Sequence, residues 1–309
     1  MITIYKTVAG KLVEQTRYSK GVWINAVSPE EEEIEQLITW GVPREVITSA
    51  LDVDELARAE KEDGVTLIIF RVPFFHGDQK DIPYTTIPMG VATSTKWIVT
   101  ISSQRTELLR ESRKSKEHPL HTRKHNTFIL HILYNTAKLY LQHLTSINRI
   151  VDNLEDRLSV SIRNKELFEL LKYQKSLVYF ATALKTNDLM VERLQRLQLF
   201  QKYDEDQDLL DDVLTENRQA MEMNNISSNI LSQMMDAFAS MISNNQNEVI
   251  KLLTSVTIVL SIPVVVASFF GMNLNLPFQG QPMAFEITLA ISVLLSVLAI
   301  FILRKKDWF

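Results

Sequence analysis

The chain has 309 residues, 46% of them hydrophobic, with a formal net charge of −4 and no cysteine. This length and hydrophobic content predict about two domains and leave apolar residues beyond those of one core. The acidic balance argues against a nucleic-acid-binding surface, and the lack of cysteine excludes disulfides, thiolate metal sites and cysteine nucleophiles.

The first hundred residues predict a mixture of strands and short helices. Ser28 and Pro29 precede two glutamates, an order typical of a helix N-cap and first turn, and this helix is expected to run to about Trp40. A second short helix is predicted over Arg44–Leu51, and the acidic stretch Asp52–Asp63 is interpreted as a linker. Strands are predicted at Ile2–Tyr5, Lys11–Gln15, Val22–Ala26, Val65–Val72, Thr85–Ala92 and Trp97–Ser102. Strands that precede a run of helices favour an α+β fold.

From about Thr106 onward the sequence is almost all helical. Apolar residues at three-to-four spacing predict helices over Asn126–Ser161 and Lys165–Leu199, and a third from near Asp206 to Phe270. A helix of about 65 residues is near 100 Å long. This third helix carries a heptad-like seam at Leu210, Leu214, Asn217, Met221, Asn224, Ser228, Leu231, Met235, Phe238, Ile242, Asn245 and Val249. Because so long a helix cannot bury itself inside one subunit, we expect parallel association with other copies of the chain.

The C-terminal part contains two candidate membrane spans. Leu252–Phe270 has no charged residue and, at about 19 residues, is close to the length that a spanning helix needs. Ile287–Leu303 is the second apolar run, and basic residues flank the pair at Lys251 and at 304–306. The connecting loop has no Lys or Arg, so the positive-inside rule predicts a multi-pass protein of the cell (inner or plasma) membrane with both termini in the cytoplasm. No cleaved signal peptide is expected at the N-terminus.

Small polar residues follow one face of the first span. Thr254, Thr257, Ser261 and Ser268 follow three-to-four spacing, with Val265 in the gap before Ser268, and therefore share one side of a helix. Such hydroxyls commonly bond back to their own helix or hold neighbouring helices together. Several copies around an axis would instead turn this stripe toward a water-filled path.

The tripeptide Gly271-Met272-Asn273 closes the first span. A short uncharged loop, the second span and a basic, aromatic tail follow it, and this arrangement resembles the CorA-type divalent-cation transporters. The resemblance implies a funnel-shaped homopentamer in which each chain has an α+β cytoplasmic domain, a long stalk helix and two transmembrane helices. The boundaries expected here are 1–203 for the α+β regulatory domain, 204–248 for the stalk, 249–273 for the pore-lining helix, 274–283 for the external loop, 284–303 for the second transmembrane helix and 304–309 for the basic tail.

The resemblance also implies a conduction path for Mg²⁺, and for Co²⁺ and Ni²⁺, down the electrochemical gradient. It places the selectivity filter at Gly271, Met272 and Asn273, where exposed carbonyls and a neutral amide oxygen suit a hydrated ion. Pore-lining residues are expected at Asn247, Ile250, Leu253, Thr254, Thr257 and Ser261. Ile250 and Leu253 are expected to form either an apolar constriction or ordinary helix packing.

The resemblance also implies a regulatory metal site in the cytoplasmic part of the protein. Asp212 lies at the stalk position where the family has an intersubunit carboxylate, and Asp78 and Asp81 are its expected partners. Mg²⁺ bound between subunits by these carboxylates would offset their repulsion and hold the pore closed. Glu286 is expected either to attract cations at the outer mouth or to be an ordinary carboxylate of a first helical turn.

Two other functions fit the sequence: a Zn²⁺ transporter of the same superfamily, which also carries the Gly-Met-Asn tripeptide, and a membrane sensor or scaffold that conducts no ion. No set of residues typical of a catalytic centre or of an organic cofactor site is found, so an enzyme is not expected. His118, His121 and His125 lie in a basic connection, and we interpret them as structural residues rather than metal ligands.

Overall fold

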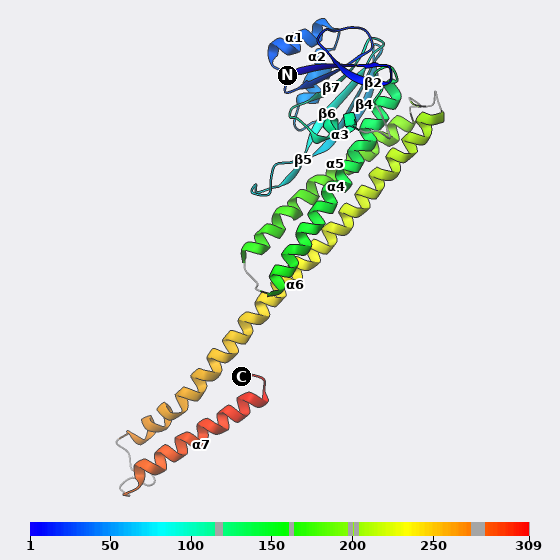
Figure 1. Ribbon diagram of the computed structural model, residues 1–309. Helices are drawn as coiled ribbons and strands as arrows, with labels where there is room; N and C mark the ends of the chain where they lie inside the picture. The colour runs from blue at the N-terminus through cyan, green and yellow to red at the C-terminus, as the bar shows by residue number, and fades with distance from the viewer. Residues whose placement is uncertain (115–119, 161–163, 197–199, 201–203, 273–281, 309) are drawn as a thin grey trace. The chain divides into compact units, whose positions relative to one another are not determined.

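The computed structural model describes residues 1–114, 120–160, 164–196, 200, 204–272 and 282–308. These residues form two compact units, Met1–Met235 and Asp236–Phe309. The elements, labelled in Figure 1, are β1 (Ile2–Val8), β2 (Lys11–Gln15), β3 (Val22–Val27), α1 (Glu31–Thr39), α2 (Arg44–Leu51), β4 (Arg58–Glu62), β5 (Val65–Phe75), β6 (Tyr84–Thr93), β7 (Trp97–Ser102), α3 (Glu107–Lys114), α4 (His125–Val160), α5 (Asn164–Arg196), α6 (Asp204–Phe270) and α7 (Ala284–Lys305). Their order, with the strands ahead of the long helices, confirms the α+β prediction.

Seven strands of the described chain form one sheet in the order β2-β1-β3-β7-β6-β5-β4. Neighbouring strands are antiparallel except β3 and β7, which run parallel. The prediction of a linker at Asp52–Asp63 was wrong in part, because Arg58–Glu62 pairs with β5 as strand β4. β4 is an edge strand, and an edge tolerates the charged side chains that conceal a strand in the sequence.

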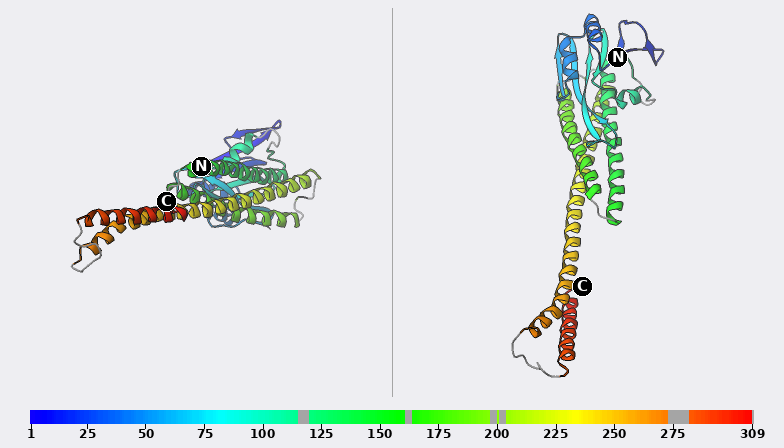
Figure 2. Two further views of the ribbon diagram at one scale, coloured as in Figure 1. Left: turned by 90° about the horizontal axis from the view of Figure 1, so that it is seen from below. Right: turned by 90° about the vertical axis from the view of Figure 1, so that its left-hand side faces the viewer.

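The sheet of the first unit has a hydrophobic core on each of its faces. Side chains alternate along β5, so that Leu67 and Ile69 join a core with α1 and α2. Ile68 and Phe70 join the opposite core, to which α4, α5 and the start of α6 contribute. Figures 1 and 2 show the helices arranged on the two sides of the sheet.

Helix α1 begins later than the sequence predicts. Its N-cap is Glu30, and the side chain of Glu33 accepts the backbone N–H of Glu30 at 3.0 Å as part of a capping box. Ser28, the predicted N-cap, has a φ of 42°, whereas an N-cap residue needs an extended backbone. The prediction of Ser28 as the cap was therefore wrong.

Helix α2 lies against the sheet at a glycine. A Cβ atom on Gly90 of β6 would lie 2.5 Å from the Cβ of Ala50 on α2. Real Cβ atoms do not approach so closely, so this contact requires glycine on the strand and a small residue on the helix.

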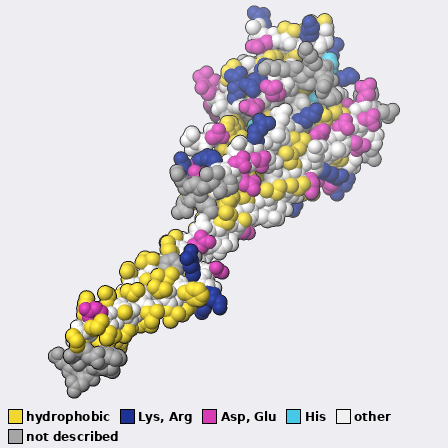
Figure 3. Space-filling model, turned by 60° about the horizontal axis from the view of Figure 1, so that its bottom comes forward, with side chains coloured by type: hydrophobic (Ala, Val, Ile, Leu, Met, Phe, Trp, Pro, Cys, Tyr) yellow, Lys and Arg dark blue, Asp and Glu magenta, His cyan; other side chains and the backbone are white. Residues whose placement is uncertain are grey.

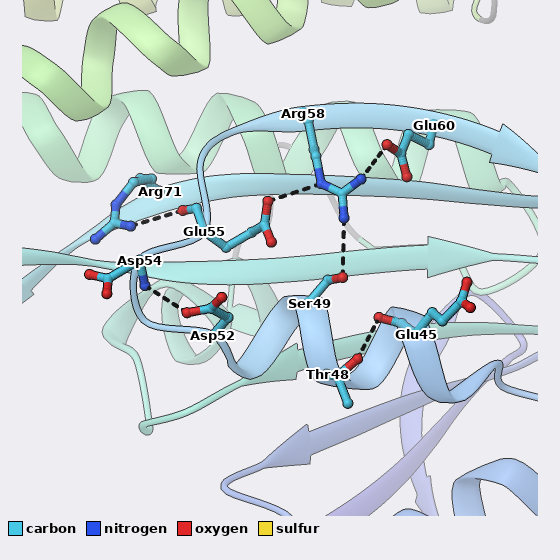
Figure 4. A network of polar contacts seen from close by, with 9 residues as sticks. All are labelled: Glu45, Thr48, Ser49, Asp52, Asp54, Glu55, Arg58, Glu60 and Arg71. Carbon is cyan, nitrogen blue, oxygen red and sulfur yellow. Dashed lines mark hydrogen bonds and ion pairs between the residues drawn. The ribbon is translucent and has the colours of Figure 1, made fainter.

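Two arginines hold the connection between α2 and the sheet (Figure 4). Arg58 of β4 forms ion pairs with Glu55 at 3.0 Å and with Glu60, and it donates to the hydroxyl of Ser49 on α2 at 3.1 Å. Arg71 of β5 donates to the backbone carbonyl of Glu55 at 2.9 Å. The connection is thereby fixed to both the helix and the strands.

Helices α4 and α5 are bonded to the other face of the sheet. Asn187 of α5 accepts the backbone N–H of Arg71 at 2.8 Å and donates to its carbonyl oxygen at 2.8 Å. The hydroxyl of Tyr140 on α4 donates to the same carbonyl oxygen at 3.0 Å. Two helices therefore meet the middle of β5 at one residue, Arg71.

The heptad-like seam of α6 is used inside the chain over its first half. Leu210, Leu214 and Leu231 are buried, and Asn217 donates to the carbonyl of Leu184 on α5 at 3.2 Å. Helices of the same chain therefore cover this part of the seam, and the expected association with other copies of the chain concerns the rest of α6. Farther along α6 the seam is open, and Val249 is 66% exposed.

In the second unit, α7 runs back along the end of α6. The buried hydroxyl of Ser255 on α6 donates to the carbonyl oxygen of Trp308 at 3.0 Å. The tail turns at Asp307, whose φ is 54°, and the Trp308 N–H bonds the carbonyl of Leu303 at 3.1 Å. These bonds form a helix C-cap of the Schellman type that returns the tail to α6.

Candidate functional site

Two helices of the described chain, α6 and α7, are long and apolar enough to cross a membrane. In the most apolar stretch of each helix, 11% is buried within the chain. A core helix of a soluble protein would be mostly covered, and Figure 3 instead shows hydrophobic side chains over most of the visible surface of this part. The two helices therefore have the exposure expected of membrane spans.

The predicted hydroxyl stripe lies on a different face of α6 from the one that packs on α7. The packed face includes Ser255 and Val266, which are buried. Successive residues of a helix are about 100° apart, so Thr254, Thr257 and Ser261 centre about a third of a turn away. Of these three, Thr257 and Ser261 are exposed in the single chain. Helix α7 therefore does not cover the hydroxyl stripe.

The hydroxyl protons of the stripe point into the helix. Thr257 donates to the carbonyl of Leu253 at 2.8 Å, and Ser261 donates to the carbonyl of Thr257 at 2.7 Å. Bonds of this kind, from a hydroxyl to a carbonyl of the same helix, are one of the two roles that the sequence suggests for the stripe; the other is the lining of a water-filled path. They leave the oxygen lone pairs outward, and a metal-bound water, whose hydrogens point away from the cation, needs acceptors of this kind.

The remaining predicted pore residues are also uncovered within the chain. Ile250 is 59% exposed and Leu253 is 67% exposed, so packing inside the chain does not occupy them. Asn247 is exposed one turn earlier. The rim of the stripe meets an open groove of about 500 Å³ between α6 and α7, lined mostly by apolar residues such as Val265 and Leu298.

Helix α6 ends at the start of the Gly-Met-Asn tripeptide. The N–H of Gly271 bonds the carbonyl of Ala267 at 2.9 Å, and a Cβ atom on Gly271 would lie only 3.3 Å from that oxygen. Met272 is 46% exposed. Asn273, the third predicted filter residue, lies outside the described residues, as does most of the loop predicted at 274–283.

The predicted regulatory carboxylates lie far apart within one chain. Asp78 is on the connection between β5 and β6, where it bonds Tyr173 of α5; burial, followed by the charge of Asp78, raises the pKa of Tyr173 to about 12. Asp212 follows Asp211, which accepts from Gln195 near the other end of α5 at 3.4 Å. Tyr173 and Gln195 are 22 residues apart on α5, or about 33 Å.

These carboxylates therefore do not form one site in a single chain. Asp81 is exposed on the same connection as Asp78, and Asp212 is exposed on α6. Among the described residues there is no cluster of three or more His, Cys, Asp or Glu side chains that could hold a metal ion. A site that joins Asp212 to Asp78 or Asp81 needs two chains.

Sequence reasoning did not identify the contact between Ser255 and Trp308. A serine inside an apolar span and a tryptophan in a tail are both common, and the bond uses the tryptophan's backbone carbonyl, whose partner no side-chain pattern indicates. Its effect is to return the tail, which carries the basic residues Arg304, Lys305 and Lys306, to the start of the first predicted span.

The pattern of a protein family described as CorA-like Mg²⁺ transporter protein matches residues 18–305. The chain belongs to the CorA family. Its match to the cobalt/magnesium transport protein CorA of Methanocaldococcus jannaschii is 26% identical over 293 residues, which are 93% of this chain and 91% of the relative.

Solved structures share the fold. The complete structure of the CorA magnesium transporter from M. jannaschii matches with a TM-score of 0.86 at 24% identity, over all of this chain and 99% of the other. The cytoplasmic domain of ZntB from Vibrio parahaemolyticus matches with a TM-score of 0.58 at 10% identity, over 80% of this chain and 98% of that domain. The full-length agreement with a CorA structure confirms the predicted order of soluble domain, long helix and two apolar helices.

Proposed function

We propose that the chain is one subunit of a homopentameric channel that admits Mg²⁺, and also Co²⁺ and Ni²⁺, across the cell membrane. Membership of a magnesium-transporter family supports transport, and the cobalt and magnesium named for the M. jannaschii relative support these ions. The observation that carries the proposal is the hydroxyl stripe of α6, which presents oxygen acceptors and is covered by neither α7 nor the rest of the described chain.

Copies of α6 arranged around an axis turn this stripe into the wall of a water-filled path. Mg²⁺ gives up its water reluctantly, so a wall of neutral acceptors that binds the water shell costs less than stripping the ion. The groove beside the stripe, with its apolar lining, suits a helix of the neighbouring subunit. Gly271, Met272 and Asn273 form the outer filter, and Ile250 and Leu253 form the inner constriction.

The driving force is the membrane potential. With both termini in the cytoplasm, inward movement of one divalent ion across 100 mV releases about 4.6 kcal/mol. No nucleotide hydrolysis is needed, and the chain acts by transport rather than catalysis. Mg²⁺ bound between Asp212 of one subunit and Asp78 or Asp81 of the next closes the path when cytosolic Mg²⁺ is high.

The test is Mg²⁺ uptake into liposomes that contain the purified protein and a Mg²⁺-sensitive dye. We expect uptake by the native protein, and a reduction of roughly tenfold in the double variant Thr257→Val/Ser261→Ala, since loss of acceptors for a charged complex costs about 1.5 kcal/mol or more. The matched control is Thr182→Val, which removes an exposed hydroxyl that also bonds its own helix, at 3.2 Å, outside the spans.

Three results would contradict the proposal. Absence of any ion flux would favour a sensor or scaffold, and flux of Zn²⁺ without Mg²⁺ would favour a zinc transporter. Normal Mg²⁺ flux in the double variant would show that the hydroxyl stripe does not line the conduction path. Asn273→Ala is expected to keep the assembly folded while Mg²⁺ selectivity is lost.

A further inference from the structure

A basic pocket lies at the end of strand β1, in the first unit, and shares no residue with the pore or regulatory sites proposed above. Its volume is about 490 Å³, within the range of small-molecule sites. It joins the turn between β1 and β2 to the segment that leads into α4. Its lining residues are Lys6, Thr7, Val8, Ala9, Gly10, His121, Arg123 and Lys124.

The two segments that line the basic pocket are joined by two reciprocal hydrogen bonds. The N–H of Thr7 donates to the hydroxyl oxygen of Thr122 at 3.2 Å, and the N–H of Thr122 donates to that of Thr7 at 3.0 Å. Thr122 is fully buried. Residues 115 positions apart in the sequence are thus held together, so the surrounding charges are gathered by the fold.

The cations of the basic pocket have few acidic partners in the described part of the chain. Lys6 donates to the neutral hydroxyl of Ser19 at 3.0 Å, and neither Lys6 nor Arg123 forms an ion pair with a described carboxylate. Lys124 is 3.8 Å from Glu205, and both side chains are largely exposed. No carboxylate is among the lining residues that the structure describes.

The pocket is positively charged, although the chain as a whole has a net charge of −4. Like charges held together repel one another, and a bound anion with several negative charges relieves that repulsion. Arginine and lysine donors around a pocket of this size suit phosphate groups in particular. None of the described lining residues belongs to a candidate membrane span, so the ligand favoured here is soluble rather than a lipid.

We propose that the basic pocket binds a soluble oligophosphate, with Lys6 and Arg123 as its main phosphate contacts. Val8, which is 51% exposed at the edge of the pocket, adds an apolar surface beside the cations. The assignment does not depend on ion conduction, so it stands or falls separately from the function proposed above.

The test is calorimetric titration of the full-length protein in detergent with pyrophosphate at low salt. We expect saturable binding that Arg123→Glu weakens at least tenfold, and that Lys6→Met also weakens. The matched control is Lys61→Glu, which reverses one exposed charge on β4, the opposite edge strand of the same sheet, and leaves binding unchanged.

A second titration uses a short-chain phosphatidic acid below its micelle concentration. Pyrophosphate binding that is lost in Arg123→Glu and kept in Lys61→Glu supports the proposal. It is overturned by absence of pyrophosphate binding in the native protein, by equal binding in Arg123→Glu, or by binding of the phosphatidic acid alone. Arg123 is exposed, so its substitution leaves the core intact, and unchanged elution of the variant on gel filtration confirms this.

Discussion

His143 on α4 shows how one buried side chain makes stability depend on pH. Its ring lies 5.2 Å from that of Tyr84, and burial lowers the pKa of His143, with the charge of Glu107 acting in the opposite direction. In the unfolded chain a histidine titrates near pH 6.5. Below that pH the unfolded chain binds a proton that the folded chain does not, so the free energy of unfolding falls as the pH is lowered.

We therefore expect the thermal midpoint of the first unit, followed in the full-length protein, to fall between about pH 7 and pH 5. His125, whose pKa burial also lowers, adds an effect of the same sign. His143→Gln should reduce the slope of midpoint against pH. An unaltered slope in His143→Gln would show that the imidazole is not protected from protonation.

At the scale of elements, the contact of α2 with β6 depends on one missing side chain. Gly90→Ala would bring two Cβ atoms to 2.5 Å, so α2 must move away from the sheet, and overpacking of this kind costs about 1 to 3 kcal/mol. We expect a lower unfolding midpoint in urea. The double variant Gly90→Ala/Ala50→Gly should recover part of the loss, although glycine inside a helix itself costs about 1 kcal/mol. A double variant no more stable than Gly90→Ala would contradict the role given to this contact.

The elements that sequence could predict are those with strong local patterns. The strands β1, β5 and β7 and the helices α4 and α5 follow from apolar periodicity, which also separates the two faces of the sheet. Strand β4 could not be predicted, because Arg58–Glu62 owes its conformation to its pairing with β5 rather than to its own side chains. The cover of the first half of the α6 seam by the same chain could not be predicted for a related reason. Asn217 occupies a heptad position, and nothing local indicates that its partner is Leu184 of the same chain rather than another copy.

The candidate site divides in the same way. The hydroxyl stripe of Thr254, Thr257 and Ser261 follows from helical spacing, and the structure adds only the direction of two hydroxyl protons and the face that α7 covers. The proposed pairing of Asp212 with a carboxylate of the β5–β6 connection has no local pattern in the sequence, because it requires two segments that belong to different subunits. Whether these carboxylates pair can be tested only in the whole assembly.

At that scale, the proposed regulatory site predicts complementation between subunits. Asp212→Asn and Asp78→Asn are each expected to relieve the inhibition of Mg²⁺ uptake by Mg²⁺ on the cytoplasmic side. Asp211→Asn is the matched control, since it changes the neighbouring carboxylate, about 100° around the helix, whose bond is to Gln195 of its own chain.

Channels assembled from an equal mixture of Asp212→Asn and Asp78→Asn chains distinguish the two possible arrangements. In a closed ring, each interface takes position 212 from one chain and position 78 from its neighbour. Each of these two positions is native in half of the chains, so about one interface in four has both native carboxylates. A pair within one chain would regain none, because every chain lacks one member. Partial return of inhibition in the mixture, read from the Mg²⁺ dependence of dye-reported uptake, therefore places the site between chains. Full insensitivity of the mixture, or equal relief of inhibition by Asp211→Asn, would remove Asp212 and Asp78 from the control of the path.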